Sequence, residues 1–271
     1  MPESRPPILT LTTDFGPDGP YVAALKGVIL GRVPHTRLID VSHQVAPQNV
    51  LEGAFVISSI LDTFPPGTVH LAVVDPGVGT DRPIVAVLVA DQWLVAPDNG
   101  LPQGAIGRRK VEEIWRVSNP ALQRGTVSHT FHGRDIMAPA ACHLLNGGDP
   151  AELGPRQDTL VELAGLTAEA TKDGLLGEVI FRDRFGNLVT NLHEDLLDNH
   201  LDWRVHIGGR VITGLCRAYG ERPPGELVAL VGSSHWLEIA VVNGDAARRI
   251  GIGPGATVSA WAVASEASQH A

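Results

Sequence analysis

The sequence predicts an α/β amino-terminal domain with a mostly parallel sheet, followed by a smaller all-β, barrel-like carboxy-terminal domain. Strand-like and helix-like segments alternate in the first half, which is typical of α/β folds. Two unbroken apolar runs in that half, residues 69–74 and 84–90, are typical of strands covered on both faces. Beyond about Leu166, short β-rich runs separated by turn residues replace this pattern. We therefore expect one domain at residues 1–166 and a second at 167–271.

The other elements of the first half follow from the spacing of apolar residues. Residues 8–13 (ILTLTT) form a short β-rich run, and residues 20–33 carry apolar side chains at helical spacing. Residues 38–41 predict a further strand. Residues 49–64 predict a second helix, which must end there because two prolines and a glycine follow. A third helix is expected at residues 134–145, before an asparagine and two glycines.

In the second half the periodicity predicts several strands and one short helix, with residues 167–174 as the linker that precedes them. The expected strands are residues 177–181, 188–192, 203–207, 227–231, 237–242 and 257–263, and the expected helix is residues 245–250.

The composition is that of an ordinary globular protein, with 44% hydrophobic and 19% charged residues among 271. A formal net charge of −9 argues against a nucleic-acid partner. Prolines interrupt the amino-terminal segment where a signal peptide would need an apolar run, and no stretch approaches the roughly 18 apolar residues of a membrane span. The only cysteines, Cys142 and Cys216, are too few for a disulfide framework. We expect a cytoplasmic protein in which both are reduced and buried.

Polar residues that end predicted strands are the first candidates for a site, because open α/β sheets bind ligands at the carboxyl ends of their strands. Asp14 ends the first strand, and its carboxylate could accept both hydroxyls of a sugar diol. Locally it could equally be a turn aspartate. Asp75 ends the strand at residues 69–74, and Arg82 can fold back to it across a glycine-containing loop. An ordinary structural ion pair would look the same.

A third polar cluster spans residues 129–135 (HTFHGRD). A histidine near an arginine and a carboxylate could act as a general base or as an orienting group. His129, His132, Asp135 and His143 do not match a zinc spacing, so no metal is expected. In the second half, residues 183–187 and 232–236 fit turns between strands, although their aromatic and amide groups could also hold a purine or an amino acid.

The ordered set of motifs TTDFG, DPGVGTDR, APDNG, TFHGRD, DRFGNLVTN and LEIAVVNG is far more specific than any one of them. From about residue 8 to residue 263 it closely resembles the S-adenosylmethionine (SAM) hydroxide adenosyltransferases, which are related to fluorinases and chlorinases. The resemblance implies a hydrolase that forms adenosine and L-methionine from SAM by attack of water on the ribose C5′ carbon. It implies no cofactor, no metal and no membrane or nucleic-acid partner. It also implies a homotrimer whose sites lie between the first domain of one subunit and the second domain of its neighbour.

The resemblance assigns roles to individual residues. Asp75, Arg82 and His132 match the set associated with water activation. The matching substrate-binding set is Asp14 for the ribose hydroxyls, Gln48, Phe131 and Gly133 around it, Phe185 and Asn187 for adenosine, Asp183 for the methionine amino group, Ser233 for its carboxylate, and the backbone of Val241 and Asn243 for the adenine edge.

Some positions depart from the family pattern. Gln48 stands where relatives often carry an aromatic residue against the sugar, and Gly232 replaces a frequent asparagine. Ser234 and His235 also differ from the usual short loop. These differences bear on the ligand contacts and leave Asp75, Arg82 and His132 unchanged.

The chemistry explains why such residues would be needed. The sulfonium of SAM departs as a neutral thioether, so no general acid is required. Water is the difficult partner, because its pKa in bulk is about 15.7. Orientation can supply roughly 7 kcal/mol in favourable cases, and a positioned base about 10²–10⁴-fold. Because an arginine beside Asp75 lowers the basicity of that carboxylate, the sequence favours His132 or a preformed hydroxide as the base.

Two alternatives remain at the level of sequence. A SAM-dependent chloride transferase would act at the same carbon, and Gly133 resembles the chlorinase pattern. Against it, the Asp75 carboxylate would repel a halide by about 1 kcal/mol even at aqueous screening. A non-catalytic module that binds adenosine or SAM would not need Asp75, Arg82 and His132 together.

Overall fold

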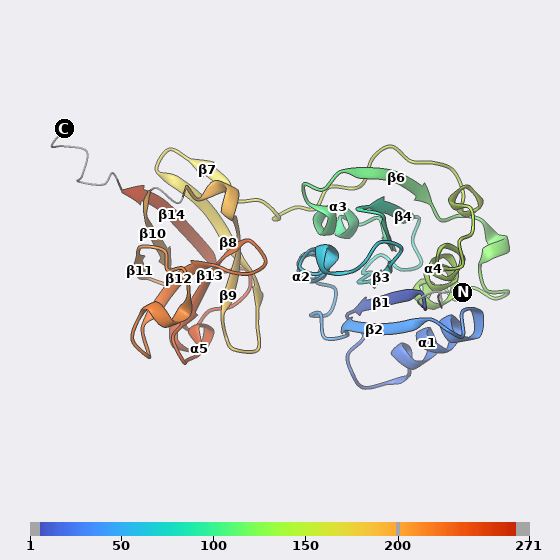
Figure 1. The fold of residues 1–271 in the computed structure, drawn as a ribbon, viewed down its shortest axis with the longest axis horizontal. Helices are drawn as coiled ribbons and strands as arrows, with labels where there is room; N and C mark the ends of the chain where they lie inside the picture. Colours follow the sequence, from blue (N-terminus) through green and yellow to red (C-terminus); the bar gives the residue numbers. More distant parts are fainter. Residues whose placement is uncertain (1–5, 199–200, 264–271) are drawn as a thin grey trace, which may run out of the picture. The chain divides into compact units, whose positions relative to one another are not determined.

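The computed structural model describes residues 6–198 and 201–263 of the chain. The chain divides into two compact units, Met1–Leu163 and Ala164–Ala271, which are described separately (Figure 1). The first unit contains a mixed, mostly parallel α/β sheet and the second an antiparallel, nearly closed barrel. The predicted fold class is therefore confirmed.

The amino-terminal sheet has the strand order β2-β1-β3-β5-β4-β6. Its parallel part pairs β1 with β2 and β3, and β3 with β5. β4 runs antiparallel to both of its neighbours, which the sequence did not indicate, since a fully covered antiparallel strand has the same apolar pattern as a parallel one. The strands are β1 (Ile8–Thr13), β2 (Arg37–Ser42), β3 (Val69–Val73), β4 (Ile84–Val89), β5 (Gln92–Pro97) and β6 (Val111–Arg116).

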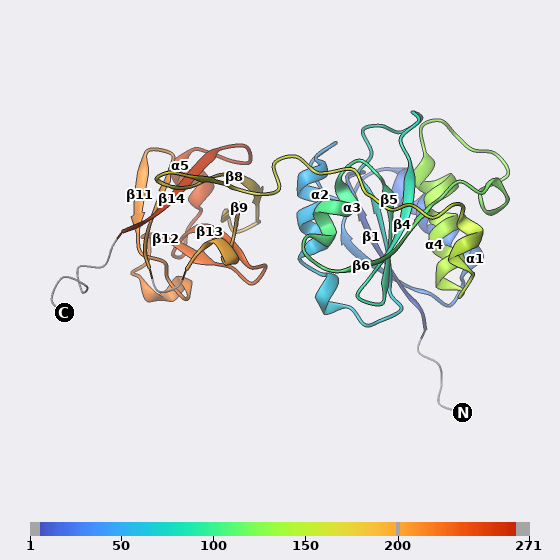
Figure 2. The same cartoon turned by 90° about the horizontal axis from the view of Figure 1, so that it is seen from above.

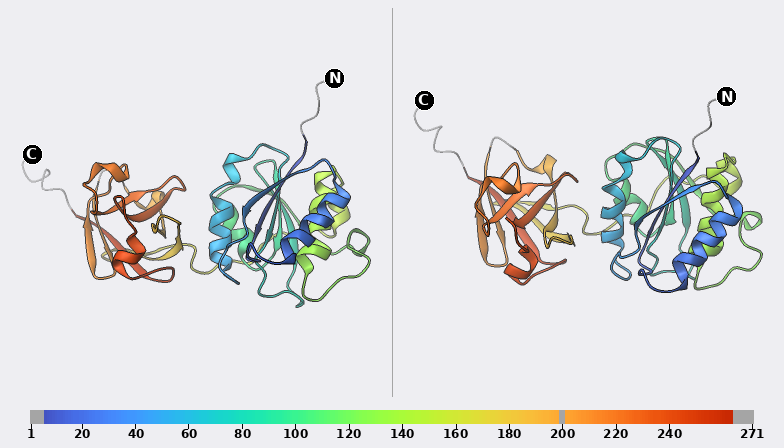
Figure 3. Two further views of the ribbon diagram at one scale, coloured as in Figure 1. Left: turned by 90° about the horizontal axis from the view of Figure 1, so that it is seen from below. Right: turned by 60° about the horizontal axis from the view of Figure 1, so that its bottom comes forward.

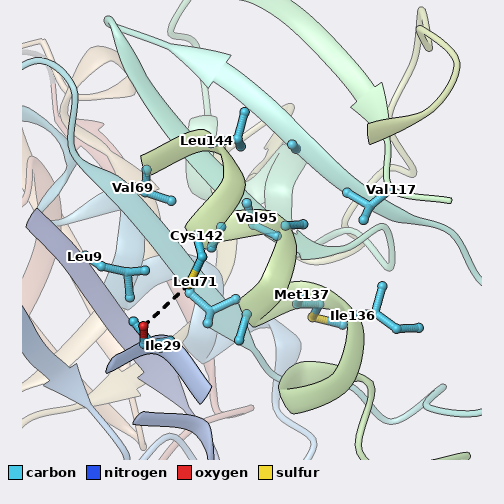
Figure 4. Close-up of a cluster of buried hydrophobic side chains, with 14 of the residues drawn as sticks. Leu9, Ile29, Val69, Leu71, Val95, Val117, Ile136, Met137, Cys142 and Leu144 are labelled. Atoms are coloured by element: carbon cyan, nitrogen blue, oxygen red, sulfur yellow. Dashed lines mark hydrogen bonds between the residues drawn. The ribbon is translucent and has the colours of Figure 1, made fainter. Parts of the chain in front are cut away.

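Helices cover both faces of this sheet (Figures 2 and 3). Helices α1 (Pro20–Arg32) and α4 (Ala138–Leu145) pack on one face, and α2 (Val50–Ser58) and α3 (Leu101–Ile106) on the other. In the core between the sheet and helices α1 and α4, the Cys142 thiol lies 4.0 Å from the Ile29 carbonyl oxygen among leucines and valines (Figure 4). Both cysteines are free and buried, as expected. Burial raises the pKa of the Cys142 thiol to about 11.

Several predicted boundaries in this unit were wrong. The helix expected over residues 49–64 ends at Ser58 and is followed by a 3₁₀ turn. The prediction was too long because Ile57 and Leu61 enter the same core, so the apolar pattern continues across the break. Strands β5 and β6 were not anticipated. Short 3₁₀ turns lie at Leu61–Thr63, Pro120–Leu122 and Pro150–Leu153 in this unit, and at Glu194–Leu196 and Tyr219–Glu221 in the carboxy-terminal unit.

The carboxy-terminal sheet has the order β11-β10-β14-β8-β9-β13-β12, and β7 pairs with β8. A bridge between Cys216, just after β11, and Leu230 in β12 brings the two ends of the sheet together. The predicted linker was wrong in part, because β7 lies within it and belongs to this sheet. The elements are β7 (Glu169–Thr171), β8 (Gly174–Arg182), β9 (Leu188–His193), β10 (Asp202–Ile207), β11 (Arg210–Thr213), β12 (Leu227–Val231), β13 (Trp236–Val241), α5 (Ala246–Ile250) and β14 (Thr257–Val263).

No helix in the described ranges is long and apolar enough to cross a membrane.

The helix expected at residues 134–145 is an α-helix only from Ala138 onward. Its first turn, Gly133–Met137, is a π-helix, a rare form that is frequent at functional sites. Gly133 is needed there for packing, since a Cβ atom at this position would lie 2.9 Å from Cγ1 of Val73 in β3. The absence of a side chain lets the π-helix lie directly against the central strand.

We expect Gly133→Ala to lower the free energy of unfolding by about 1–3 kcal/mol, because the stiff Val73 side chain cannot move aside. The loss should be smaller in a Val73→Ala background, which removes the colliding methyl group. Urea denaturation of the four proteins measures this coupling. Gly125→Ala is the control, because nothing lies within 4 Å of a Cβ atom there. Equal losses in both backgrounds would contradict the packing explanation.

Candidate active site

Asp75, Arg82 and His132 form one hydrogen-bonded group in the amino-terminal unit. Arg82 Nε donates to Asp75 Oδ1 at 2.7 Å, and Arg82 Nη2 donates to Asp75 Oδ2. The same Nη2 contacts His132 Nδ1 at 3.0 Å. The side chains of Arg82 and Asp75 are 10% and 5% exposed, so this fork is largely shielded from water. Residues separated by 50 positions in the sequence therefore form a single cluster.

The contact with Arg82 determines the protonation of His132. A guanidinium has only N–H donors, so the Nδ1 atom that faces it must be an acceptor without a proton. Burial and then the charge of Arg82 lower the pKa of His132 below its ordinary value of 6.5. At neutral pH the imidazole is therefore neutral, and its one proton is on Nε2, which is a donor.

Three features of the fold bring these residues together. Asp75 follows β3, where Asn99 Nδ2 of the APDNG motif donates to the Val74 carbonyl at 3.0 Å. Gly79, at φ +80°, allows the 75–82 loop to reach the 129–132 segment, since a Cβ atom there would collide with the His129 carbonyl oxygen. His132 directly precedes the π-helix that rests on β3. The glycines of these motifs thus set the distance between Arg82 and His132.

Asp14 and Gln48 form a second contact at the same edge of the sheet. The Gln48 backbone N–H donates to Asp14 Oδ2 at 2.8 Å, and Gln48 adopts φ +65°, which is unusual outside glycine. Asp14 directly follows Thr13, which pairs with Val73 two residues before Asp75. The ring of Phe131 packs edge-on to that of Phe15, with centroids 5.6 Å apart. These contacts join the Asp14 loop to the segment that carries His132.

In the carboxy-terminal unit, Asp183 closes the loop between β8 and β9. Its Oδ1 atom accepts from the backbone N–H groups of Phe185 and Asn187 at 2.9 and 2.8 Å, and its Oδ2 atom accepts from Asn187 Nδ2 at 2.9 Å. Asn187 is 7% exposed, whereas the Phe185 side chain is 78% exposed. A polar pair of one half-buried and one buried side chain thus holds the turn that carries a large apolar ring open to solvent.

The other predicted binding residues of this unit are less closely connected. Ser233 is exposed in the turn between β12 and β13. Val241 ends β13, and its carbonyl accepts from the Gly244 N–H at 2.9 Å across Asn243, which has φ +53°. Among the described residues no hydrogen bond joins Ser233, Val241 or Asn243 to Asp183.

Glu238, which neighbours Asn187, and its hydrogen-bond partner Tyr219 were not predicted from the sequence. Glu238 is 7% exposed in β13, where it accepts from Tyr219 Oη at 2.6 Å and from the Asn187 side chain. Burial raises the pKa of Glu238, and the charge of Asp183 adds to the effect. Burial, together with the hydrogen bond to Glu238, also raises the pKa of Tyr219. The sequence did contain one sign of the buried Glu238, because it is a glutamate inside the apolar run WLEIAV.

The histidines and acids of the 129–143 region do not gather around a common point. Among the described residues, no group of three or more His, Cys, Asp and Glu side chains is placed to hold a metal ion. His143 Nε2 contacts the Asp149 carbonyl at 3.0 Å. Asp135 is fully buried and accepts from Arg124, Arg134 and the Ser128 N–H at 2.8–2.9 Å. Asp135 therefore anchors the segment that carries His132.

Comparison with known proteins gives consistent matches over both units. Residues 9–154 match the model of the SAM hydroxide adenosyltransferase N-terminal domain, and residues 177–259 match that of its C-terminal domain. A protein from Thermus thermophilus named (R)-S-adenosyl-L-methionine hydrolase is 39% identical, over 91% of this chain and 96% of its own length. A fluorinase from an Actinoplanes species is 30% identical, over 73% and 76%. The crystal structure of an uncharacterized conserved protein from Thermotoga maritima aligns with a TM-score of 0.85 and 35% identity, over 94% of this chain and 99% of that one.

We expect Asp135→Asn to destabilise the protein by about 2 kcal/mol at pH 7, because it leaves two arginines without a buried partner charge. Burial opposes ionisation of Asp135, but the hydrogen bonds from Arg134, Ser128 and Arg124 outweigh it and lower its pKa from 3.8 to about 2. Since the folded-state pKa is the lower one, this stabilisation is present above about pH 4 and is lost as the pH falls toward 2. Urea denaturation over this range measures the difference, with the exposed Asp18→Asn as control. A difference that persists unchanged to pH 2 would contradict the assignment.

Proposed function

The chain belongs to the SAM hydroxide adenosyltransferase family, and we propose that it hydrolyses SAM to adenosine and L-methionine. The observation that carries the proposal is the buried contact of Arg82 with both Asp75 and His132, next to the loop of Asp14. Water attacks the ribose C5′ carbon, the C5′–S bond breaks, and its electron pair remains on sulfur as a neutral thioether. One proton is released. The related hydrolase carries the prefix (R), so the substrate proposed includes the (R) epimer at sulfur.

In this mechanism Asp75 accepts the proton. His132 Nδ1 is already occupied by Arg82 and its Nε2 carries a hydrogen, so the imidazole has no free acceptor for water. The Asp75 oxygens each accept one hydrogen bond from Arg82 and keep further lone pairs. A carboxylate of low basicity is sufficient, because water becomes strongly acidic as its oxygen bonds to carbon. His132 Nε2–H donates to the nucleophilic oxygen and fixes its direction.

The substrate contacts and the assembly belong to the same proposal. Asp14 holds the ribose hydroxyls, and Phe131 and Gly133 lie beside the sugar. Gln48 supports this site through its backbone N–H, which donates to the Asp14 carboxylate. Asp183, Phe185, Asn187, Ser233, Val241 and Asn243 receive the methionine and adenine groups. We further propose a cytoplasmic homotrimer, in which the exposed Phe185 ring completes the site of a neighbouring subunit.

The direct test is hydrolysis in water enriched in oxygen-18. We expect the label in the adenosine 5′-hydroxyl and none in the methionine, measured by mass spectrometry of both products, with the (R) and (S) epimers of SAM assayed separately. Label in methionine, or no turnover of either epimer, would refute the proposal. Formation of 5′-chloro-5′-deoxyadenosine at high chloride would instead identify a halide transferase.

Substitutions distinguish the roles of Asp75 and His132. Asp75→Asn removes the proton acceptor and should lower kcat by about 10²–10⁴-fold. His132→Asn keeps an acceptor for Arg82 but loses the Nε2–H donor, and should lower kcat by only about tenfold. Asp81→Asn, on the exposed part of the same loop, is the control. The opposite ranking would make His132 the base.

The pH profile provides an independent readout of His132. Protonation of Nδ1 would break the contact with Arg82 and place two positive charges side by side. Since the pKa of His132 lies below 6.5, wild-type kcat should be constant through neutral pH and should fall only at lower pH. The His132→Asn enzyme should lack this particular fall. A loss of wild-type activity centred above pH 6.5 would contradict the neutral-imidazole assignment.

A further inference from the structure

A second histidine of the amino-terminal unit lies in a chain of side-chain contacts that the mechanism above does not use. His43 Nδ1 lies 2.9 Å from Thr13 Oγ1 at the end of β1. His43 Nε2 is buried and lies 3.1 Å from Asp40 Oδ1, and the other oxygen of Asp40 accepts from Lys26 Nζ at 2.6 Å. The chain therefore runs from a surface lysine through an aspartate and a histidine to Thr13.

The chemistry of each group gives the direction of these contacts. The carboxylate beside Nε2 favours the tautomer with its proton on that atom, so Nδ1 accepts from the Thr13 hydroxyl. Thr13 Oγ1 in turn accepts from the Phe15 N–H at 3.3 Å. Burial raises the pKa of Asp40, but the hydrogen bond from Lys26 and the close approach of the His43 imidazole outweigh it and keep the carboxyl ionised.

The order of aspartate, histidine and hydroxyl is that of a nucleophilic triad, but Thr13 cannot serve as the nucleophile. Thr13 is fully buried in the sheet, so no substrate carbon can reach its Oγ1 atom. The contacts must therefore act on the structure around Thr13, whose next residue in the chain is Asp14.

The segment after β2 holds the Asp14 loop at three successive points. His43 Nδ1 takes the Thr13 hydroxyl, the Gln48 N–H donates to the Asp14 carboxylate, and the His43 carbonyl accepts from the Gly16 N–H at 2.8 Å. An irregularity in the pairing of β1 with β2, where Leu11 pairs with Asp40 and Thr12 with Ser42, brings His43 next to Thr13.

We propose that His43 is a positioning residue that fixes the direction of the Asp14 carboxylate through Thr13. This inference rests on the proposed function, in which Asp14 binds the two hydroxyls of the ribose. It identifies a residue outside the substrate contacts that determines how strictly the enzyme recognises a ribose over a deoxyribose.

The experiment compares the dissociation constants of adenosine and 2′-deoxyadenosine, measured by calorimetry on the full chain. Wild-type protein should prefer adenosine, and Asp14→Ala should abolish the preference. His43→Ala and the isosteric Thr13→Val should each reduce the preference by about tenfold, because a misdirected carboxylate loses a hydrogen bond to a charged group. His43→Asn, whose amide oxygen can replace Nδ1, should recover most of it.

His35→Ala is the matched control, because it makes the same substitution at an exposed histidine of the same unit. His43→Ala in the Asp14→Ala background should have no further effect on the preference, which a general loss of stability would not reproduce. An unchanged preference in both His43→Ala and Thr13→Val, while Asp14→Ala abolishes it, would overturn the role of His43 and leave the proposed function intact. An unchanged preference in Asp14→Ala would overturn the ribose assignment itself, and with it this inference.

Discussion

The interaction on which the site depends is the contact of one guanidinium with two different acceptors. Because Arg82 can only donate, its neighbours must both accept, which requires an ionised Asp75 and an unprotonated Nδ1 on His132. The protonation of the whole cluster is thus determined by geometry. Much of the surrounding fold maintains that geometry. Gly79 permits the close approach of the 75–82 loop to His129, Gly133 permits that of the π-helix to β3, and Asp135 anchors the segment that carries His132.

This arrangement suits a substrate that carries its own leaving-group activation. A sulfonium departs as a neutral thioether, so the protein needs neither a general acid nor a strong base. What remains is to orient a water molecule and to accept a proton late in the reaction. Carboxylates are weak bases and are poorly suited to deprotonating free water, but a carboxylate suits a water that is already bonding to carbon.

Sequence patterns predicted the parts of this molecule that depend on local structure. The bounds of β1, β12 and β14 coincide with the apolar runs that indicated them. The direction of β4, the π-helix at Gly133 and the contact of His43 with Thr13 could not be predicted, because each depends on which distant segment lies alongside. Glu238 could have been noticed as a charge within an apolar strand, but its partners Tyr219 and Asn187 lie on other elements.

Gly133 illustrates how a residue can acquire a different meaning once its surroundings are known. In the sequence it was the one feature in favour of a halide transferase. In the structure its lack of a side chain is explained by the 2.9 Å that would separate a Cβ atom from Val73, irrespective of the nucleophile. The electrostatic argument against a halide remains, and it concerns the negative charge of Asp75 in the cluster with Arg82 and His132. Both protons of Arg82 Nη2 are already shared between Asp75 and His132, so an incoming chloride would meet a carboxylate before it met an unoccupied donor on that nitrogen. A neutral water molecule, which can donate to Asp75 and accept from His132, carries no such penalty.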